Sequence, residues 1–298
     1  MIISSLNGGL GNQMFQYAAA RRLAEKHSTP LKLDINWFET QALRHYRLRY
    51  FNIWENLATS NEILNLVNNT TFYEKLFTPI RSKFGFTQSL DGFRRNEGTF
   101  KEKYFHFDPK FMDAPNNIYV EGFWQSEKYF LEIASTIRQE FTLKYPQSLI
   151  FHQILELISN TCSISIHIRR GDYVNNSEAN LFHGVCSLDY YRYAVKYISE
   201  HVKDPHFFVF SDDFDWFNEN LNINAPMNLV SKNKSLRDYE ELNLMSQCKH
   251  HIIANSSFSW WGAWLNSKVD KIVVAPKEWF RDTAKDTEDL IPSTWIRL

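Results

Sequence analysis

Short apolar strands alternate with helices along most of this chain, and that alternation limits the folds open to it. A strand at 1–6 precedes a glycine-rich turn and a helix at 14–27, and a strand at 30–35 follows. A second series begins near residue 150, with strands at 161–168, 206–211, 250–255 and 271–276 and helices at 187–202, 235–248 and 257–267. Alternation of this kind favours parallel sheets covered by helices, so we expect an α/β fold.

The length of 298 residues suits one large domain or two of ordinary size. A helical pattern covers residues 126–144, and the segment "KYPQS" at 144–148 follows it with a proline. Proline disfavours helix in the residue before it, so a break between two units is expected there. We therefore predict an N-terminal domain at 1–148 and a C-terminal domain at 149–298.

Charge and cysteine content argue against several classes of protein. The 33 Lys and Arg residues nearly balance 34 Asp and Glu, which does not favour nucleic acid as a partner. Three cysteines without a C-x-x-C pair favour free thiols over a disulfide framework or a zinc site. No apolar run of about 18 residues is present, so no transmembrane helix is expected, and the first residues do not resemble a signal peptide.

Four of the predicted strands end in polar or glycine-rich segments. These segments are "NGGLGNQ" after 1–6, "RRGD" after 161–168, "DDFD" after 206–211 and "NSSFSWWG" after 250–254. In open parallel sheets, ligands bind outside the carboxyl ends of the strands. Because all four segments fall at such ends, we expect them to form one binding site.

The first segment suits an anion. Gly9 and Gly11 allow close approach to the backbone, and the helix that follows offers free N–H groups. A tight turn without a ligand explains the glycines equally well. A dinucleotide-binding turn, with Asp34 as its acidic residue, is a third reading, although Met14 occupies the third glycine position. That reading supports a nicotinamide-dependent oxidoreductase as the alternative function.

The second segment carries two adjacent arginines, Arg169 and Arg170. Adjacent side chains on an extended strand point to opposite faces, so usually one of them reaches a given site. The guanidinium fork matches phosphate oxygens, which favours a phosphate ligand for at least one arginine. A salt bridge, to Asp172 or to an acidic residue of a helix, is the alternative.

The third and fourth segments offer carboxylates and hydroxyl groups. Asp212, Asp213 and Asp215 suit a metal ion, a contact to a base or ribose, or a helix cap. Ser256 and Ser257 open a tryptophan-rich helix, where hydroxyl groups and free N–H groups make a second anion site. The tryptophans of that helix are expected in the core.

Together, the motifs "GGLGNQMFQYAAA", "GFWQSEKYF", "HIRRGDYV", "SLDYY", "FSDD" and "NSSFSWWGAWL" resemble those of α-1,2-fucosyltransferases of glycosyltransferase family 11, in the family's order. The resemblance implies a GT-B fold, with two Rossmann-like domains facing a central cleft. It implies that the C-terminal domain binds GDP-β-L-fucose and the N-terminal domain lies on the acceptor side. It also implies inverting transfer of fucose to the 2-hydroxyl of a terminal galactose or similar hexose, without a metal or another cofactor.

The resemblance also implies roles for single residues. Arg169 matches a β-phosphate contact and Asn12 an asparagine near the donor. Asp172 completes the expected catalytic set, either by orienting Arg169 or by accepting a proton. The donor-binding set expected from the motifs is Gly9, Gly11, Asn12, Gln13, His167, Arg169, Arg170, Ser211, Asp212, Asp213, Asn255, Ser256, Ser257 and Phe258. Candidates for the base that activates the acceptor are Asp172, Asp34, His183 and Glu121.

A third hypothesis, a carbohydrate-binding module without catalysis, rests on the nine tryptophans. The expected partners are GDP-fucose and a galactose-containing glycan. A cytoplasmic location is expected, and a lipid-linked acceptor would bring the chain to the inner face of the plasma membrane as a peripheral protein.

Overall fold

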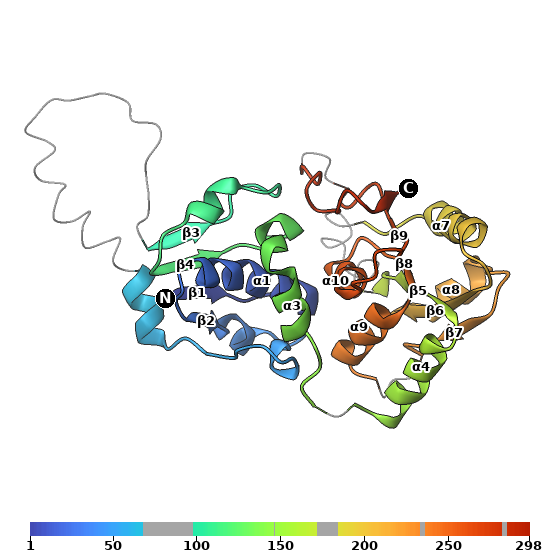
Figure 1. The fold of residues 1–298 in the computed structure, drawn as a ribbon, viewed down its shortest axis with the longest axis horizontal. Coiled ribbons are helices and arrows are strands. Elements are labelled where there is room, and N and C mark those ends of the chain that lie inside the picture. The colour runs from blue at the N-terminus through green and yellow to red at the C-terminus, as the bar shows by residue number, and fades with distance from the viewer. Residues whose placement is uncertain (68–97, 146, 172–183, 233–235, 282–284) are drawn as a thin grey trace, which may run out of the picture.

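The computed structural model describes residues 1–67, 98–145, 147–171, 184–232, 236–281 and 285–298. Within them the chain forms two parallel sheets, one in each half (Figure 1). The expected α/β fold of GT-B type, with two helix-covered sheets facing a central cavity, is confirmed. Short 3-10 helices connect the larger elements at Asn36–Thr40, Leu48–Tyr50, Pro109–Asp113, Glu127–Tyr129 and Leu131–Ile133.

The N-terminal sheet has the strand order β2-β1-β4-β3. Its strands are β1 (Ile2–Ser5), β2 (Leu31–Asp34), β3 (Thr99–Lys101) and β4 (Ile118–Glu121). β1 pairs with β2 through Ile2 and Leu31, and with β4 through Ile2 and Ile118. The chain moves from β1 to β2 on one side and later returns to β4 on the other. The strand order therefore reverses between β1 and β4, which is where open α/β sheets bind ligands.

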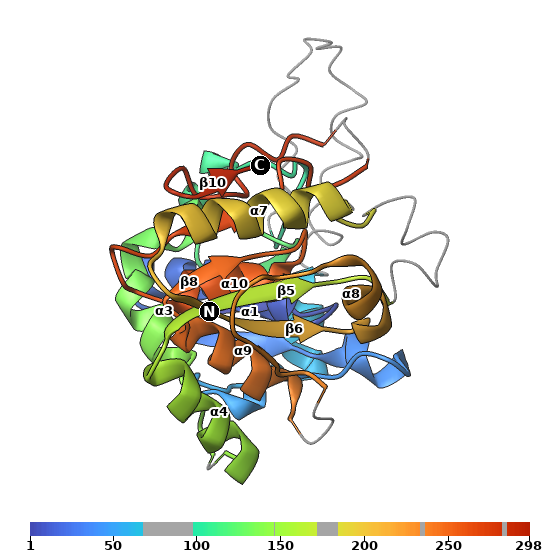
Figure 2. The ribbon, with the colours of Figure 1, turned by 90° about the vertical axis from the view of Figure 1, so that its right-hand side faces the viewer.

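The C-terminal sheet has the order β10-β9-β8-β5-β6-β7. Its strands are β5 (Cys162–Ile168), β6 (Pro205–Ser211), β7 (Met227–Leu229), β8 (His250–Ile252), β9 (Val273–Ala275) and β10 (Ile296–Arg297). Helix α7 (Leu188–His201) covers one face, and α4 (Leu149–Ser159) and α9 (Asp238–Gln247) cover the other (Figure 2). α8 (Phe214–Asn220) follows β6. The order reverses between β5 and β8, giving a second ligand-binding position.

Helix α1 (Leu10–Lys26) begins four residues before the start predicted from sequence. Gly11 and Asn12 are therefore part of its first turn, and Gly9 is the N-cap. The predicted helix over 126–144 is also different: two 3-10 turns precede α3 (Ala134–Glu140), which is only seven residues long.

Helix α10 (Ser257–Leu265) joins the two halves. It follows β8 of the C-terminal sheet, yet its tryptophans belong to the same buried cluster as the core residues of the N-terminal half. Figure 1 places it between the two sheets. Trp261 stacks on Phe130 with ring centroids 5.3 Å apart, and its indole N–H donates to the Gly11 carbonyl at 3.0 Å. The expected core role of these tryptophans is confirmed, and they fix the orientation of α1 against α10.

Among the described residues, no helix is both long enough and apolar enough to cross a membrane.

Candidate functional site

A cavity of about 710 Å³ lies where the strand order of each sheet reverses. The N-terminal half lines it with residues that follow β1 and β4, including Gly9, Asn12 and Gln125. The C-terminal half lines it with residues that follow β5, β6 and β8, including Arg169, Asp212 and Ser256. The four polar strand ends therefore meet at one cavity.

Two helices begin at this cavity. The N-cap of α1 is Gly9, which has no side chain, and that of α10 is Ser256, whose hydroxyl accepts no N–H of the first turn. The first N–H groups of a helix have no partner within the helix and carry its positive dipole end. Two uncapped N-termini on one cavity therefore make a strong site for an anion such as a diphosphate.

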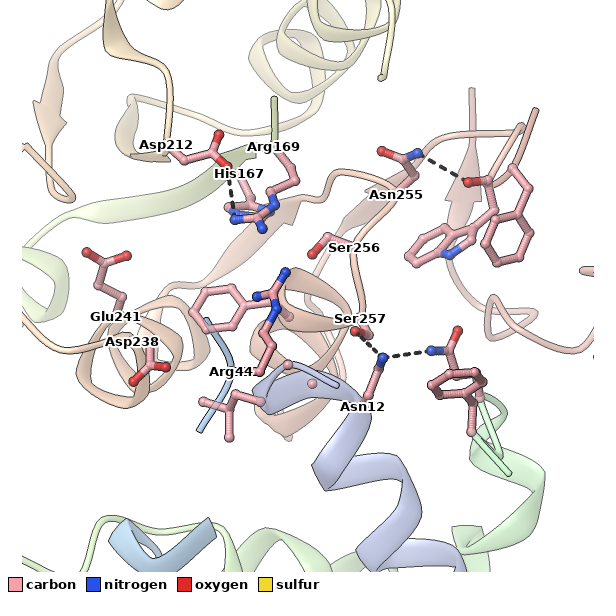
Figure 3. A pocket seen from close by; sticks show the side chains of 18 of the residues that line it. Asn12, Arg44, His167, Arg169, Asp212, Asp238, Glu241, Asn255, Ser256 and Ser257 are labelled. Carbon is pink, nitrogen blue, oxygen red and sulfur yellow. Dashed lines mark hydrogen bonds and ion pairs between the residues drawn. The ribbon is translucent and has the colours of Figure 1, made fainter. Parts of the chain in front are cut away.

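An arginine adds a full positive charge beside these helix ends. Arg169 follows β5, and its Nη1 lies 2.9 Å from Oδ2 of Asp212 (Figure 3). The other oxygen of Asp212 accepts the backbone N–H of Arg170 at 2.8 Å. Asp212 is therefore used to orient Arg169, which is a different use from the nucleoside contact considered from sequence.

His167 is a neutral polar group in the wall of the cavity. Burial, with the Arg169 guanidinium nearby, lowers the pKa of its imidazole to about 3. Its Nδ1 is buried and has no hydrogen-bond partner among the described residues. Buried polar atoms in native proteins are nearly always paired, so an unpaired nitrogen at this position is unusual. A neutral histidine of such low pKa is a hydrogen-bonding group and a poor base.

Several predicted residues line the cavity, but their side chains make hydrogen bonds to other groups of the protein. The amide of Asn255 donates to the carbonyls of Gly184 and Trp279. The hydroxyl of Ser211 accepts the backbone N–H of Asp213, and that of Ser257 donates to Oδ1 of Asn12 at 2.8 Å. Ser256 and Phe258 also line the cavity.

The structure places other predicted residues away from the cavity. The Gln13 amide bridges the carbonyls of Gly8 and His45 and accepts the N–H of Arg47. Arg170 pairs with Asp213, which caps α8. These side chains are engaged within the protein.

Two of the four candidates for the base, Asp34 and Glu121, are described by the structure and lie away from the cavity. Asp34 accepts the hydroxyl of Tyr119 at 2.8 Å, and Glu121 pairs with Lys101. Neither lines the cavity. Asp172 and His183 lie outside the described residues.

Sequence reasoning missed about half of the lining. The aromatic members are Phe105, Phe123, Trp279 and Phe280, and the polar ones are Arg44, Gln125, Ser231, Asp238, Glu241 and Lys285. The motif "GFWQSEKYF" contains two of them, but no strand-end rule singled these out. Within the described ranges, no group of three histidine, cysteine or acidic side chains is arranged to hold a metal ion.

Glu241 is an acid held in an unfavourable place for a charge. Burial, together with the nearby carboxylates of Asp238 and Asp212, raises its pKa to about 7, against a hydrogen bond from Ser231 that lowers it. The folded protein therefore holds a proton that the unfolded chain releases near pH 4.5.

A Glu241→Gln variant should test this shift. A raised carboxyl pKa means that the folded state loses stability as pH rises from about 4.5 to 7. The neutral variant avoids that loss, so its Tm without ligand should exceed the wild-type Tm by several degrees at pH 8 and converge with it at pH 4.5. Glu156→Gln, on the exposed face of α4, serves as the control. Parallel Tm curves for Glu241→Gln and wild type would contradict the assignment.

Comparison with known proteins agrees with this geometry. The family model "Glycosyl transferase family 11" matches residues 1–298. An alpha-1,2-colitosyltransferase from Escherichia coli is 34% identical over 100% of this chain and 99% of the relative. The O-antigen biosynthesis glycosyltransferase WbnK from Escherichia coli is 36% identical over 99% of each chain. The human galactoside alpha-(1,2)-fucosyltransferase 1 is 25% identical over 49% of this chain and 42% of its own length. With the family model matching along its whole length, the chain belongs to glycosyl transferase family 11.

Proposed function

We propose that this glycosyltransferase moves L-fucose from GDP-β-L-fucose to the 2-hydroxyl of a terminal galactose, or a similar hexose, with inversion and without a metal ion. The observation that carries the proposal is the meeting of two uncapped helix N-termini and Arg169 at one cavity. A diphosphate is the anion that best uses three such donors close together. The proposal includes two domains: an acceptor-side N-terminal domain at 1–148 and a donor-binding C-terminal domain at 149–298.

The two ends of the cavity differ in chemistry, which gives the donor a direction. Figure 3 shows Asp238 and Glu241 on the side opposite Asn255. Carboxylates accept the N–H groups of a guanine edge, so the base lies at the acidic end. The amide of Asn255 donates to the Trp279 carbonyl, and Trp279 and the adjacent Phe280 both line the cavity. Aromatic faces suit the apolar face of a deoxysugar, so the fucosyl group lies at that end.

The reaction leaves negative charge on the β-phosphate as the bond to the fucosyl carbon breaks. Arg169, the Ser256 hydroxyl and the N–H groups of α10 are placed to stabilise that charge before it develops. His167, neutral at physiological pH, donates or accepts a hydrogen bond to the nucleotide. The acceptor hydroxyl attacks the opposite face of the sugar carbon as the bond to GDP breaks, which inverts the configuration, and its proton is released to a base or to water.

A donor assay tests the proposal. Purified protein is incubated with GDP-fucose and lactose, with and without EDTA, and GDP release and the linkage in the product are measured. We expect an α-1,2-linked fucosyl product and a rate that EDTA does not change. No GDP release with lactose or any other galactoside tested would overturn the proposal, and loss of activity in EDTA would overturn its metal-independent part.

Colitosyl transfer is the second candidate, favoured by the full-length relative that is an alpha-1,2-colitosyltransferase. GDP-colitose is therefore run beside GDP-fucose at equal concentration. A kcat/KM at least tenfold higher for GDP-colitose would assign the colitosyl activity, and the reverse ratio would assign fucosyl transfer.

A further inference from the structure

The segment 122–126, between β4 and the next 3-10 turn, has an unusual backbone. Trp124 has a φ of +56°, in the left-handed region that bulky residues rarely adopt. Such strain costs on the order of 1–3 kcal/mol and persists only where surrounding contacts impose it. Here the Trp124 ring is fully buried, with its centroid 4.4 Å from that of Phe111.

The carboxylate of Glu102 helps to hold this segment in place. Glu102 accepts the backbone N–H of Phe123 at 2.7 Å and that of Trp124 at 2.9 Å. The two residues on either side of the strained position, Phe123 and Gln125, then line the cavity. The strained backbone therefore presents side chains to the site.

Gln125 uses its position to contact Asn12. Its Nε2 donates to Oδ1 of Asn12 at 2.9 Å, and the Ser257 hydroxyl donates to the same oxygen at 2.8 Å (Figure 3). Gln125 comes from the segment that follows β4 of the N-terminal sheet, and Ser257 is the first residue of α10. Both acceptor positions of the Asn12 carboxamide oxygen are thus filled.

This arrangement fixes which end of the Asn12 side chain meets a substrate. An asparagine amide offers an acceptor at one end and two donors at the other. With the oxygen held by Gln125 and Ser257, rotation of the amide would lose both hydrogen bonds. No group in the described part of the chain accepts from its Nδ2, so the NH₂ group remains as a donor to the cavity.

We propose that Gln125 is a positioning residue, which orients the Asn12 carboxamide so that its NH₂ group donates to an oxygen of the bound sugar nucleotide. The proposal rests on the transfer reaction proposed above. It assigns a purpose to the strained segment, because Glu102 and Trp124 set the backbone from which Gln125 reaches Asn12.

A Gln125→Glu variant tests the direction of the hydrogen bond. A protonated carboxyl group can donate to Oδ1 of Asn12 as the glutamine does, whereas a carboxylate can only accept. Ionisation would therefore turn the Asn12 amide and present its oxygen to the substrate. We expect the ratio of variant to wild-type kcat/KM to fall by about 10–100-fold as pH rises from 5 to 9, since small errors of placement cost this much. Gln125→Leu should show a loss that does not depend on pH.

In the ratio of variant to wild-type kcat/KM, the pH dependence of every titrating group that both proteins share cancels. Gln139→Glu, on the exposed part of α3, is the matched control and should give a flat ratio near one. A flat ratio for Gln125→Glu would overturn the proposal, whether its value is near one or low, because a purely structural role does not titrate.

A second readout needs no turnover. A carboxyl group that must donate has a raised pKa, so the Tm of Gln125→Glu relative to wild type should fall as pH rises. A difference that stays constant or grows in favour of the variant would mean that Asn12 donates to Gln125, and the proposal would be wrong. If the wild-type protein transfers neither fucose nor colitose, the transfer proposal fails, and the Tm comparison alone decides the orientation of Asn12.

Discussion

Replacing Arg169 with alanine is expected to lower kcat/KM for the sugar nucleotide by at least about 10²–10³, the usual effect of losing one preorganised donor at a developing negative charge. The guanidinium lies at the carboxyl end of β5, on the cavity that α1 and α10 reach with their N-termini. The variant also leaves Asp212 in the cavity wall without its ion pair, which adds repulsion toward a diphosphate. Steady-state kinetics with varied donor measures the loss of kcat/KM. Calorimetry with GDP measures the loss of affinity for the diphosphate.

The neighbouring arginine supplies the matched control. Arg170 carries the same charge one residue along the chain, but it pairs with Asp213 at 3.2 Å and lies over the Trp216 ring. Arg170→Ala should therefore lower Tm, and it should reduce kcat/KM much less than Arg169→Ala does. Arg169→Lys keeps the charge and loses the two-pronged geometry, so an intermediate rate is expected. Wild-type turnover in Arg169→Ala would remove the phosphate role from this residue.

The strand-end rule located the cavity because it depends on topology alone. The ends of parallel strands meet at one edge of a sheet whatever the loops contain, so Arg169 and Ser256 could be placed together from the sequence. The roles of adjacent residues could not be separated in this way. Asp212 and Asp213 are consecutive, yet one orients Arg169 and the other caps α8. Only the turn of the chain after β6 decides which carboxylate faces the cavity.

The residues that sequence reasoning missed reach the cavity from other kinds of position. Glu241 lies within α9, Arg44 follows a 3-10 turn, and Gln125 depends on the positive φ of Trp124. A helix interior carries no strand-end signal, and a strained backbone at a tryptophan is not expected from its propensity. These residues are recognised as part of the cavity lining only when the two sheets are placed face to face.

The structure gives a second physical reason for glycine at position 11, besides the close approach of a ligand. The glycine was expected to let a ligand approach the backbone. In the structure, a Cβ at this position would lie 2.5 Å from the Ser257 carbonyl carbon and 2.6 Å from the Phe258 nitrogen. Both atoms belong to the backbone of α10, which cannot move away by changing a rotamer. Gly11 therefore permits the close contact of α1 with α10, on which the shared aromatic core depends.

Gly11→Ala should accordingly destabilise the protein by about 1–3 kcal/mol or more, as overpacking of a well-packed interior does. We expect Tm to fall by several degrees and near-UV circular dichroism from the buried tryptophans to weaken. Gly9→Ala is the control, because a Cβ there meets only Nη1 of Arg44 at 3.5 Å and its φ of −76° suits any residue. If the glycine served ligand approach alone, both variants would keep the wild-type Tm and lose only GDP affinity. If Gly11 is needed for the close packing of α1 against α10, Gly11→Ala must have a lower Tm than Gly9→Ala.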